Sequence, residues 1–202
     1  MKVMIVVTHL LGTGHLARAL TLGRAFQAAG DQVQIVSGGC SAPQLDTCGI
    51  PLLQLPPLRS DGVNFTQLLT PDNTLADEGY HRTRQVALCA ALRAMQPDLL
   101  ITELYPFGRR SLRAEFRALL EAAQQLPKRP KVLASIRDIL APPSKPEKAI
   151  KADAMIAEFY DAVLVHSDPQ ATPLALSWPV SDMLAAKLHY TGFVAPAAAG
   201  PH

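Results

Sequence analysis

Short apolar runs alternate with longer amphipathic stretches along this chain of 202 residues. The runs are rich in Val, Ile and Leu, as expected of strands that are covered on both faces of a sheet. They span residues 3–7, 33–36, 52–55, 99–102, 132–135 and 163–165. This alternation is typical of β-α-β units, so it predicts an α/β fold with a doubly wound, mostly parallel sheet of about six or seven strands and helices on both faces.

Four amphipathic stretches predict the main helices. In residues 13–29, Leu16, Leu20 and Phe26 fall on one side of a helical wheel and Arg18 falls on the other. The remaining helices are expected at residues 72–95, 111–126 and 147–159, and prolines follow the second and third. Residues 55–70 and 141–146 have no regular period and are predicted as loops. Residues 1–194 are therefore expected to form one domain, followed at 195–202 by a frayed end or the start of a linker.

Composition and charge exclude several classes of protein. The formal charge of +2 is spread thinly, which argues against a nucleic-acid partner. Cys40, Cys48 and Cys89 are odd in number and lack C-x-x-C spacing, so neither a disulfide framework nor a metal site is expected, and a cytoplasmic location fits best. No apolar run approaches the roughly 18 residues of a membrane span. A soluble protein is expected, although peripheral contact with a membrane surface stays open.

A glycine-containing loop, Gly12-Thr13-Gly14, joins the first strand to the first helix. In parallel sheets of this kind, ligands bind at the carboxyl ends of the strands, where this loop lies. Glycines let the backbone pass close to a ligand, and the free N–H groups of a first helical turn favour an anion or a polarised oxygen. We therefore predict that these three residues bind substrate.

The loop is not the fingerprint of a dinucleotide-binding protein. Ala17 stands where the third glycine of G-x-G-x-x-G would be, and residues 37–39 supply no acidic residue for a ribose. A nicotinamide-dependent dehydrogenase is therefore disfavoured, and no cofactor is expected.

His15 is the main candidate for catalysis. In the first turn of a helix, the positive end of the helix dipole favours a neutral imidazole, and a neutral imidazole can act as a general base. The alternative is a histidine that only bonds a neighbouring loop, and the pattern alone does not separate the two interpretations.

Five motifs in order along the chain resemble those of MurG-like bacterial glycosyltransferases. They are G-T-G-H at 12–15, T-E-L-Y-P-F-G-R-R at 102–110, S-I-R-D-I-L at 135–140, V-H-S-D-P at 165–169 and Y-T-G-F-V at 190–194. The resemblance covers nearly the whole chain. One departure is the loop before His15, which lacks a glycine that the MurG-type sequence G-G-T-G-G-H contains. It therefore stays open which residues of this loop would contact a phosphate.

The resemblance implies the Rossmann-like N-terminal half of a two-domain GT-B glycosyltransferase. In such enzymes this half binds the acceptor, and the C-terminal half binds the nucleotide-sugar donor. By the same resemblance, His15 would take the proton of the acceptor hydroxyl. Only eight residues follow Val194, so the donor half is expected as a further domain or a separate subunit, and this chain alone should barely turn over. The acceptor would be a small molecule, a saccharide or a lipid-linked compound.

Further candidates follow later strands. Glu103 is assigned to catalysis, because a carboxylate there could orient the imidazole or an acceptor hydroxyl. Asp138 is assigned to substrate binding, although capping a helix or pairing with an arginine is the favoured alternative. Arg109 and Arg110 would hold an anionic acceptor, with a solvated basic face as the alternative. His166 is also assigned to substrate binding, although a packed or capping role is commoner for such a histidine.

Two other functions stay open at this point. One is a non-enzymatic ligand-binding domain on the same scaffold, because a fold does not determine a function. The other is a nucleotide-sugar 2-epimerase or hydrolase, a group that shares the two-domain fold. The sequence leaves open the sugar, the nucleotide, the acceptor, the stereochemical outcome and the oligomeric state.

Overall fold

A computed structural model describes residues 1–47, 49–63, 65 and 67–195 of the chain. Its centre is one sheet of seven strands, all parallel, in the order β3-β2-β1-β4-β5-β6-β7. The strands are β1 (Lys2–Val7), β2 (Gln32–Gly39), β3 (Leu52–Leu58), β4 (Leu99–Glu103), β5 (Lys131–Arg137), β6 (Ala162–His166) and β7 (Leu188–Tyr190). The predicted parallel, doubly wound sheet is therefore confirmed.

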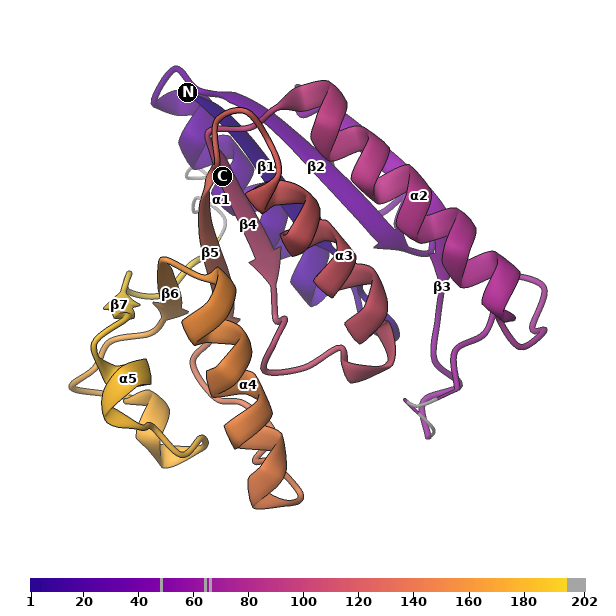
Figure 1. The fold of residues 1–202 in the computed structure, drawn as a ribbon. Helices are drawn as coiled ribbons and strands as arrows, with labels where there is room; N and C mark the ends of the chain where they lie inside the picture. Colours follow the sequence, from indigo (N-terminus) through magenta and orange to yellow (C-terminus); the bar gives the residue numbers. More distant parts are fainter. Residues whose placement is uncertain (48, 64, 66, 196–202) are drawn as a thin grey trace, which may run out of the picture.

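Helices cover both faces of the sheet, as Figure 1 shows. α1 (Gly14–Ala28) lies on one face, and α2 (Glu78–Met95), α3 (Arg113–Gln124) and α4 (Pro146–Phe159) lie on the other. The change of face follows from right-handed crossovers, because the chain first runs from β1 toward the β3 edge and later from β4 toward the β7 edge. β1 and β4 are thus the point where the strand order reverses, and ligands bind at such switch points.

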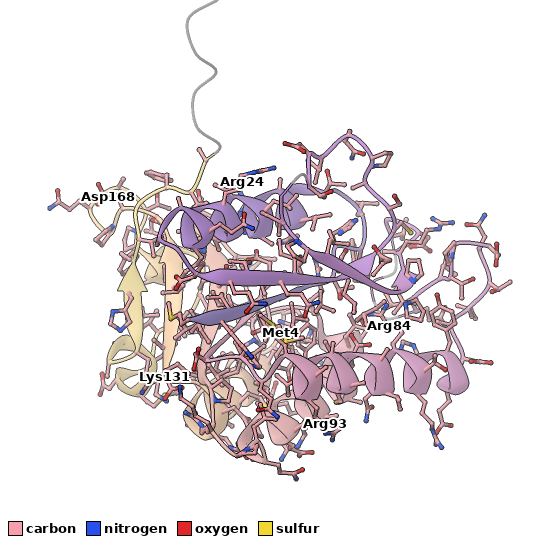
Figure 2. The ribbon with its side chains drawn as sticks, turned by 90° about the horizontal axis from the view of Figure 1, so that it is seen from above. Met4, Arg24, Arg84, Arg93, Lys131 and Asp168 are labelled. Carbon is pink, nitrogen blue, oxygen red and sulfur yellow. The ribbon has the colours of Figure 1, made fainter. Side chains whose placement is uncertain are left out.

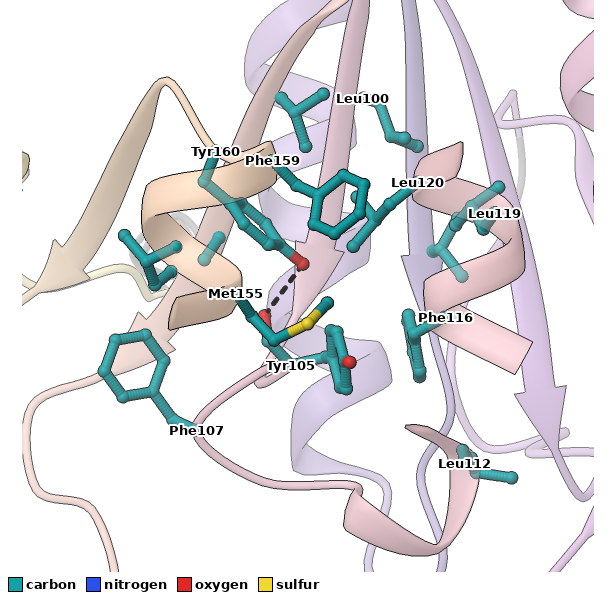
Figure 3. Close-up of a cluster of buried hydrophobic side chains, with 14 of the residues drawn as sticks. Leu100, Tyr105, Phe107, Leu112, Phe116, Leu119, Leu120, Met155, Phe159 and Tyr160 are labelled. Atoms are coloured by element: carbon teal, nitrogen blue, oxygen red, sulfur yellow. Dashed lines mark hydrogen bonds between the residues drawn. The ribbon is translucent and has the colours of Figure 1, made fainter. Parts of the chain in front are cut away.

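The core has two parts, one on each face of the sheet. On the α1 face, Leu16 and Leu20 pack against Val3, Ile5 and Ile101, which project from β1 and β4. On the opposite face, a larger cluster joins the sheet to α2, α3 and α4, and aromatic rings such as Tyr105, Phe116 and Phe159 fill it (Figure 3). Alternate residues of each strand supply the two parts, as the two-residue period of a strand requires.

The structure corrects several predicted boundaries. β3 continues through Pro56 and Pro57, which an edge strand tolerates because one side of it needs no N–H donors. α2 begins at Glu78, not at residue 72, because the Asp77 side chain caps it by accepting from the backbone N–H of Tyr80 at 2.7 Å. Residues 196–202 of the predicted tail 195–202, Cys48 and part of the loop 55–70 fall outside the described residues.

Short elements complete the fold. The chain adds two 3₁₀ turns, η1 (Arg110–Leu112) and η2 (Leu174–Leu176), and a one-turn helix, α5 (Asp182–Ala185), which the periodicity of the sequence did not predict. β7 follows α5 and adds a three-residue edge strand beside β6.

A buried ion pair joins α2 to α3. The fully buried Arg84 guanidinium donates to both carboxylate oxygens of Glu115, at 2.9 and 3.0 Å. It also donates to the carbonyl oxygens of Gly38, at 3.0 Å, and Pro56. Figure 2 shows Arg84 between α2 and the sheet, whereas Arg93 of the same helix lies on its outer side. This pair therefore fastens two helices to the carboxyl ends of β2 and β3.

Candidate functional site

His15 and Glu103 meet at the switch point of the sheet. His15 stands in the first turn of α1, and Glu103 ends β4 on the same face. The imidazole Nδ1 lies 3.0 Å from Glu103 Oε1. Glu103 is 1% exposed, whereas the His15 side chain is 23% exposed. A buried carboxylate thus holds an imidazole that solvent, or a ligand, can still reach.

Hydrogen bonds continue from Glu103 across the sheet. Ser135 is the register partner of Glu103 on β5, and its hydroxyl donates to Glu103 Oε2 at 2.5 Å. The same Ser135 oxygen lies 2.9 Å from Nε2 of His166, which ends β6. Nδ1 of His166 lies 2.8 Å from the hydroxyl of Thr191, just beyond β7. Five side chains from α1, β4, β5, β6 and the segment after β7 therefore form one row, which we call the polar row.

Donors and acceptors in the polar row can be assigned from its carboxylate. An ionised Glu103 only accepts, so both His15 Nδ1 and the Ser135 hydroxyl donate to it. The Ser135 hydroxyl donates its only proton to Glu103, so its oxygen accepts a hydrogen bond from His166 Nε2–H. The other nitrogen of that ring, Nδ1, then accepts from the hydroxyl of Thr191. The assignment leaves Nε2 of His15 as a lone-pair acceptor, and no described residue is hydrogen-bonded to that nitrogen.

Electrostatics support these protonation states. Burial opposes the charge of Glu103, but hydrogen bonds from His15 and Ser135 and the charge of Arg18 hold its pKa below the ordinary value. Arg18 Nη1 donates to Glu103 Oε1 at 2.6 Å. Desolvation lowers the pKa of His166 to about 4, so this imidazole is neutral at pH 7.

Arg109 lies on the same side as this pair. Its backbone has a left-handed conformation, with φ of 58°, and its Nε donates to the carbonyl oxygen of Thr8 at 2.5 Å. Desolvation lowers its pKa to about 10, and the charge of Glu103 raises it. Arg109 therefore stays cationic near the His15–Glu103 pair at neutral pH.

His9 is a site residue that the sequence analysis missed. It is 4% exposed, and its Nδ1 is buried with no hydrogen-bond partner in the described structure. Desolvation is the main cause that lowers its pKa, a backbone hydrogen bond with Cys40 opposes this, and the charges of Arg109 and His15 lower the pKa further. His9 lines a cavity of about 190 Å³ together with Thr13, Cys40, Arg59 and neighbouring residues.

Gly39 makes room for His9. A Cβ atom at Gly39 would collide with the His9 carbonyl oxygen and come within 2.6 Å of its imidazole. Gly38 is crowded in the same way by Thr8 and Arg84. These glycines, which stand where a dinucleotide-binding protein has an acidic residue, are therefore needed for packing the first loop.

The predicted loop 12–14 lies open above this cavity. A Cβ atom at Gly12 or Gly14 would meet nothing within 4 Å. Thr13 is the N-cap residue of α1, yet its side chain makes no capping hydrogen bond. The first-turn N–H groups are thus not occupied by a side-chain cap, as the predicted anion or oxygen ligand requires.

Comparison with solved structures places this geometry in a known fold. MurG from Acinetobacter baumannii superposes with a TM-score of 0.52 at 17% identity, over 89% of this chain and 43% of MurG. UGT2 from Phytolacca americana gives 0.54 at 12% identity, over 98% and 52%. The chain has the Rossmann-like fold of one half of a GT-B protein such as MurG. The spinosyn forosaminyltransferase SpnP gives 0.51 at 16% identity, over 96% of this chain and 51% of SpnP.

These matches show the fold, and they span about half of each solved protein. No family model matches the chain, and no curated protein matches its sequence. Among the described residues, no group of three His, Cys, Asp or Glu side chains could hold a metal ion. None of the helices in the described ranges is long and apolar enough to cross a membrane.

Two predicted binding residues, Asp138 and Arg110, have no hydrogen bond to the His15–Glu103 pair, whereas His166 is linked to it through Ser135. Asp138 accepts from its neighbour Arg137 at 3.2 Å, as the alternative interpretation predicted. Arg110 is directed away from Arg109 and donates to the Phe107 carbonyl oxygen at 3.4 Å. His166 is 4% exposed, and both of its ring nitrogens are engaged within the polar row.

Proposed function

We propose that this chain is the acceptor-binding half of a glycosyltransferase, with His15 as the general base. The observation that carries the proposal is the partly exposed imidazole whose Nδ1 is held by the buried Glu103 carboxylate at 3.0 Å. It lies where a ligand is expected in this fold, at the strand-order reversal. The donor would be a nucleotide sugar, held by a further domain or a separate subunit, because the matched enzymes are about twice as long.

The proposed step is a displacement at the anomeric carbon of the donor. His15 Nε2 accepts the acceptor's hydroxyl proton while the acceptor oxygen forms a bond to that carbon. The bond from the carbon to the nucleotide diphosphate breaks, and the diphosphate leaves with the electron pair. Glu103 stabilises the imidazolium that forms, because a carboxylate within hydrogen-bond distance favours the charged ring.

Ser135 and His166 are positioning residues in this proposal. They fix Glu103 Oε2 from the side opposite His15, so the carboxylate cannot rotate without breaking a buried hydrogen bond. Such outer partners orient the group that contacts the reacting atoms. In this proposal His15, at the exposed end of the polar row, takes part in the reaction, and Ser135 and His166, in its buried part, keep the Glu103 carboxylate in position.

The test is turnover by the chain together with its donor-binding half. His15→Ala should reduce kcat by roughly 100-fold or more, the usual scale for a general base, with an unchanged melting temperature. His189→Ala is the matched control, because His189 is an exposed histidine on β7. Near wild-type turnover of His15→Ala with an unaltered pH profile would refute the role of His15.

Binding by the isolated chain tests the assignment of halves. Calorimetric titration with UDP-sugars should give weak binding at most, because this half is proposed to hold the acceptor. Tight, saturable binding of a UDP-sugar to the chain alone would assign the donor site to this half instead.

A further inference from the structure

A groove of about 360 Å³ lies between α3 and α4, on the sheet face opposite α1. Its apolar floor includes Pro106, Ala152 and Met155. The polar row lies on the α1 face of the sheet, so the groove is separate from the His15–Glu103 pair. A volume of this size is sufficient for a small organic ligand.

The groove carries an excess of positive charge. Five cations line it: Arg110, Arg113, Arg117, Lys148 and Lys151. The single acidic residue of the lining, Glu158, is already paired with Arg117 at 3.1 Å, and Arg117 also bridges to Glu121 at 2.8 Å. The other four cations have no acidic partner among the described residues, so the groove is suited to an anion.

A buried hydroxyl without a partner lies at the groove floor. Tyr105 is 2% exposed, and its ring stacks on Phe116 at 4.5 Å between centroids, as Figure 3 shows. No hydrogen-bond partner is found for its hydroxyl in the described structure. Tyr105 itself lines the groove, together with Arg113, Arg117 and Glu158, whose charges act on its hydroxyl.

The protonation state of Tyr105 makes it a donor. Desolvation raises its pKa to about 12, so at neutral pH the group is a phenol that can donate a hydrogen bond. A buried donor that is left unpaired costs free energy, and native proteins rarely keep one without a ligand or water. A bound anion would satisfy the hydroxyl and balance the unpaired cations together.

We propose that the groove between α3 and α4 is a binding site for an organic phosphate, with Tyr105 and Arg113 contacting the phosphate oxygens. A phosphate offers several acceptor oxygens, which suits one hydroxyl surrounded by guanidinium and ammonium groups. The organic part of the ligand would lie on Pro106 and Met155. This site does not depend on the glycosyltransferase proposal, because it uses neither His15 nor Glu103.

The experiment is calorimetric titration of the chain with inorganic pyrophosphate and inorganic phosphate. We expect saturable binding of one anion per chain, weakened about tenfold by Tyr105→Phe and by Arg113→Gln, as for the loss of a hydrogen bond to a charged group. Arg93→Gln is the matched control, since it removes the same charge from the exposed face of α2. Its affinity should stay at the wild-type value.

Thermal unfolding separates binding from folding. Without ligand, Tyr105→Phe should melt at or above the wild-type temperature, because it removes an unpaired buried hydroxyl. With pyrophosphate, the stabilisation of the wild type should be largely lost in this variant. Absence of saturable binding, equal weakening by Arg93→Gln, or unchanged affinity of the two groove variants would overturn the proposal. Binding to anionic vesicles without binding of either soluble anion would identify a membrane surface instead, which also overturns it.

Discussion

Replacing Glu115 by glutamine would leave a buried guanidinium without its counter-charge. Arg84 is fully buried and Glu115 is 3% exposed, and two hydrogen bonds of 2.9 and 3.0 Å join them. Removing one partner of a buried pair costs about 3–5 kcal/mol, because the remaining charge cannot be solvated. The carbonyl oxygens of Gly38 and Pro56 solvate Arg84 only in part. The loss is therefore a large share of the roughly 5–15 kcal/mol that stabilise a typical domain.

Urea unfolding measures this cost, and α3 offers its own control. Glu121 is on the same helix, but it is 47% exposed and pairs with the surface residue Arg117. Glu121→Gln should leave the unfolding midpoint almost unchanged, because exposed ion pairs contribute little. Glu115→Gln should lower the midpoint by more than 1 M, given a slope of about 2 kcal/mol per M. A cost below about 1 kcal/mol for Glu115→Gln would show that Arg84 is solvated in some other way.

Two further predictions concern the first loop and the polar row. Gly39→Ala should lower the free energy of unfolding in urea by about 1–3 kcal/mol, because the new Cβ would overlap His9. Gly12→Ala is the control and should lower it much less, because a Cβ there has free space. Equal losses in the two variants would contradict the packing role of Gly39. For His166, the folded pKa of about 4 lies below the unfolded value of about 6.5, so the unfolded state binds more protons between these values. The contribution of neutral His166 to the free energy of unfolding is then complete above pH 6.5 and falls by about 2–3 kcal/mol on acidification to pH 4.5. The variant His166→Gln should not show this part of the acid-induced decrease. An imidazole NMR titration of His166 with a midpoint near 6.5 would contradict it.

The sequence predicted the main helices from their amphipathic periods and most of the sheet from continuous apolar runs of Val, Ile and Leu between them. It also predicted that His15 and Glu103 would be neighbours, since both follow parallel strands at the same edge. It did not predict α5, because four residues are too few for a helical period, or β7, because the three residues Leu188, His189 and Tyr190 form no continuous apolar run.

Long-range polar contacts were the part that local patterns could not supply. Arg84 lies on a predicted helix, but its partner Glu115 is 31 positions away, so no local pattern connects the two residues. Ser135 was assigned only to a strand, and the hydrogen bond that gives it a role depends on the register of β4 with β5. The substrate-binding assignments of Arg109, Arg110, Asp138 and His166 stay predictions.

Arg109 and Arg110 are adjacent in the chain but serve opposite layers of the molecule. Arg109 donates to the Thr8 carbonyl oxygen near the His15–Glu103 pair, and Arg110 lines the groove between α3 and α4. The left-handed backbone at Arg109 makes this divergence possible. The segment from Leu104 to Arg110 should therefore tolerate substitutions better than changes in its length. Inserting or deleting one residue there would place both cations on the wrong face of the sheet. Lysine at either position would keep each charge on its own face.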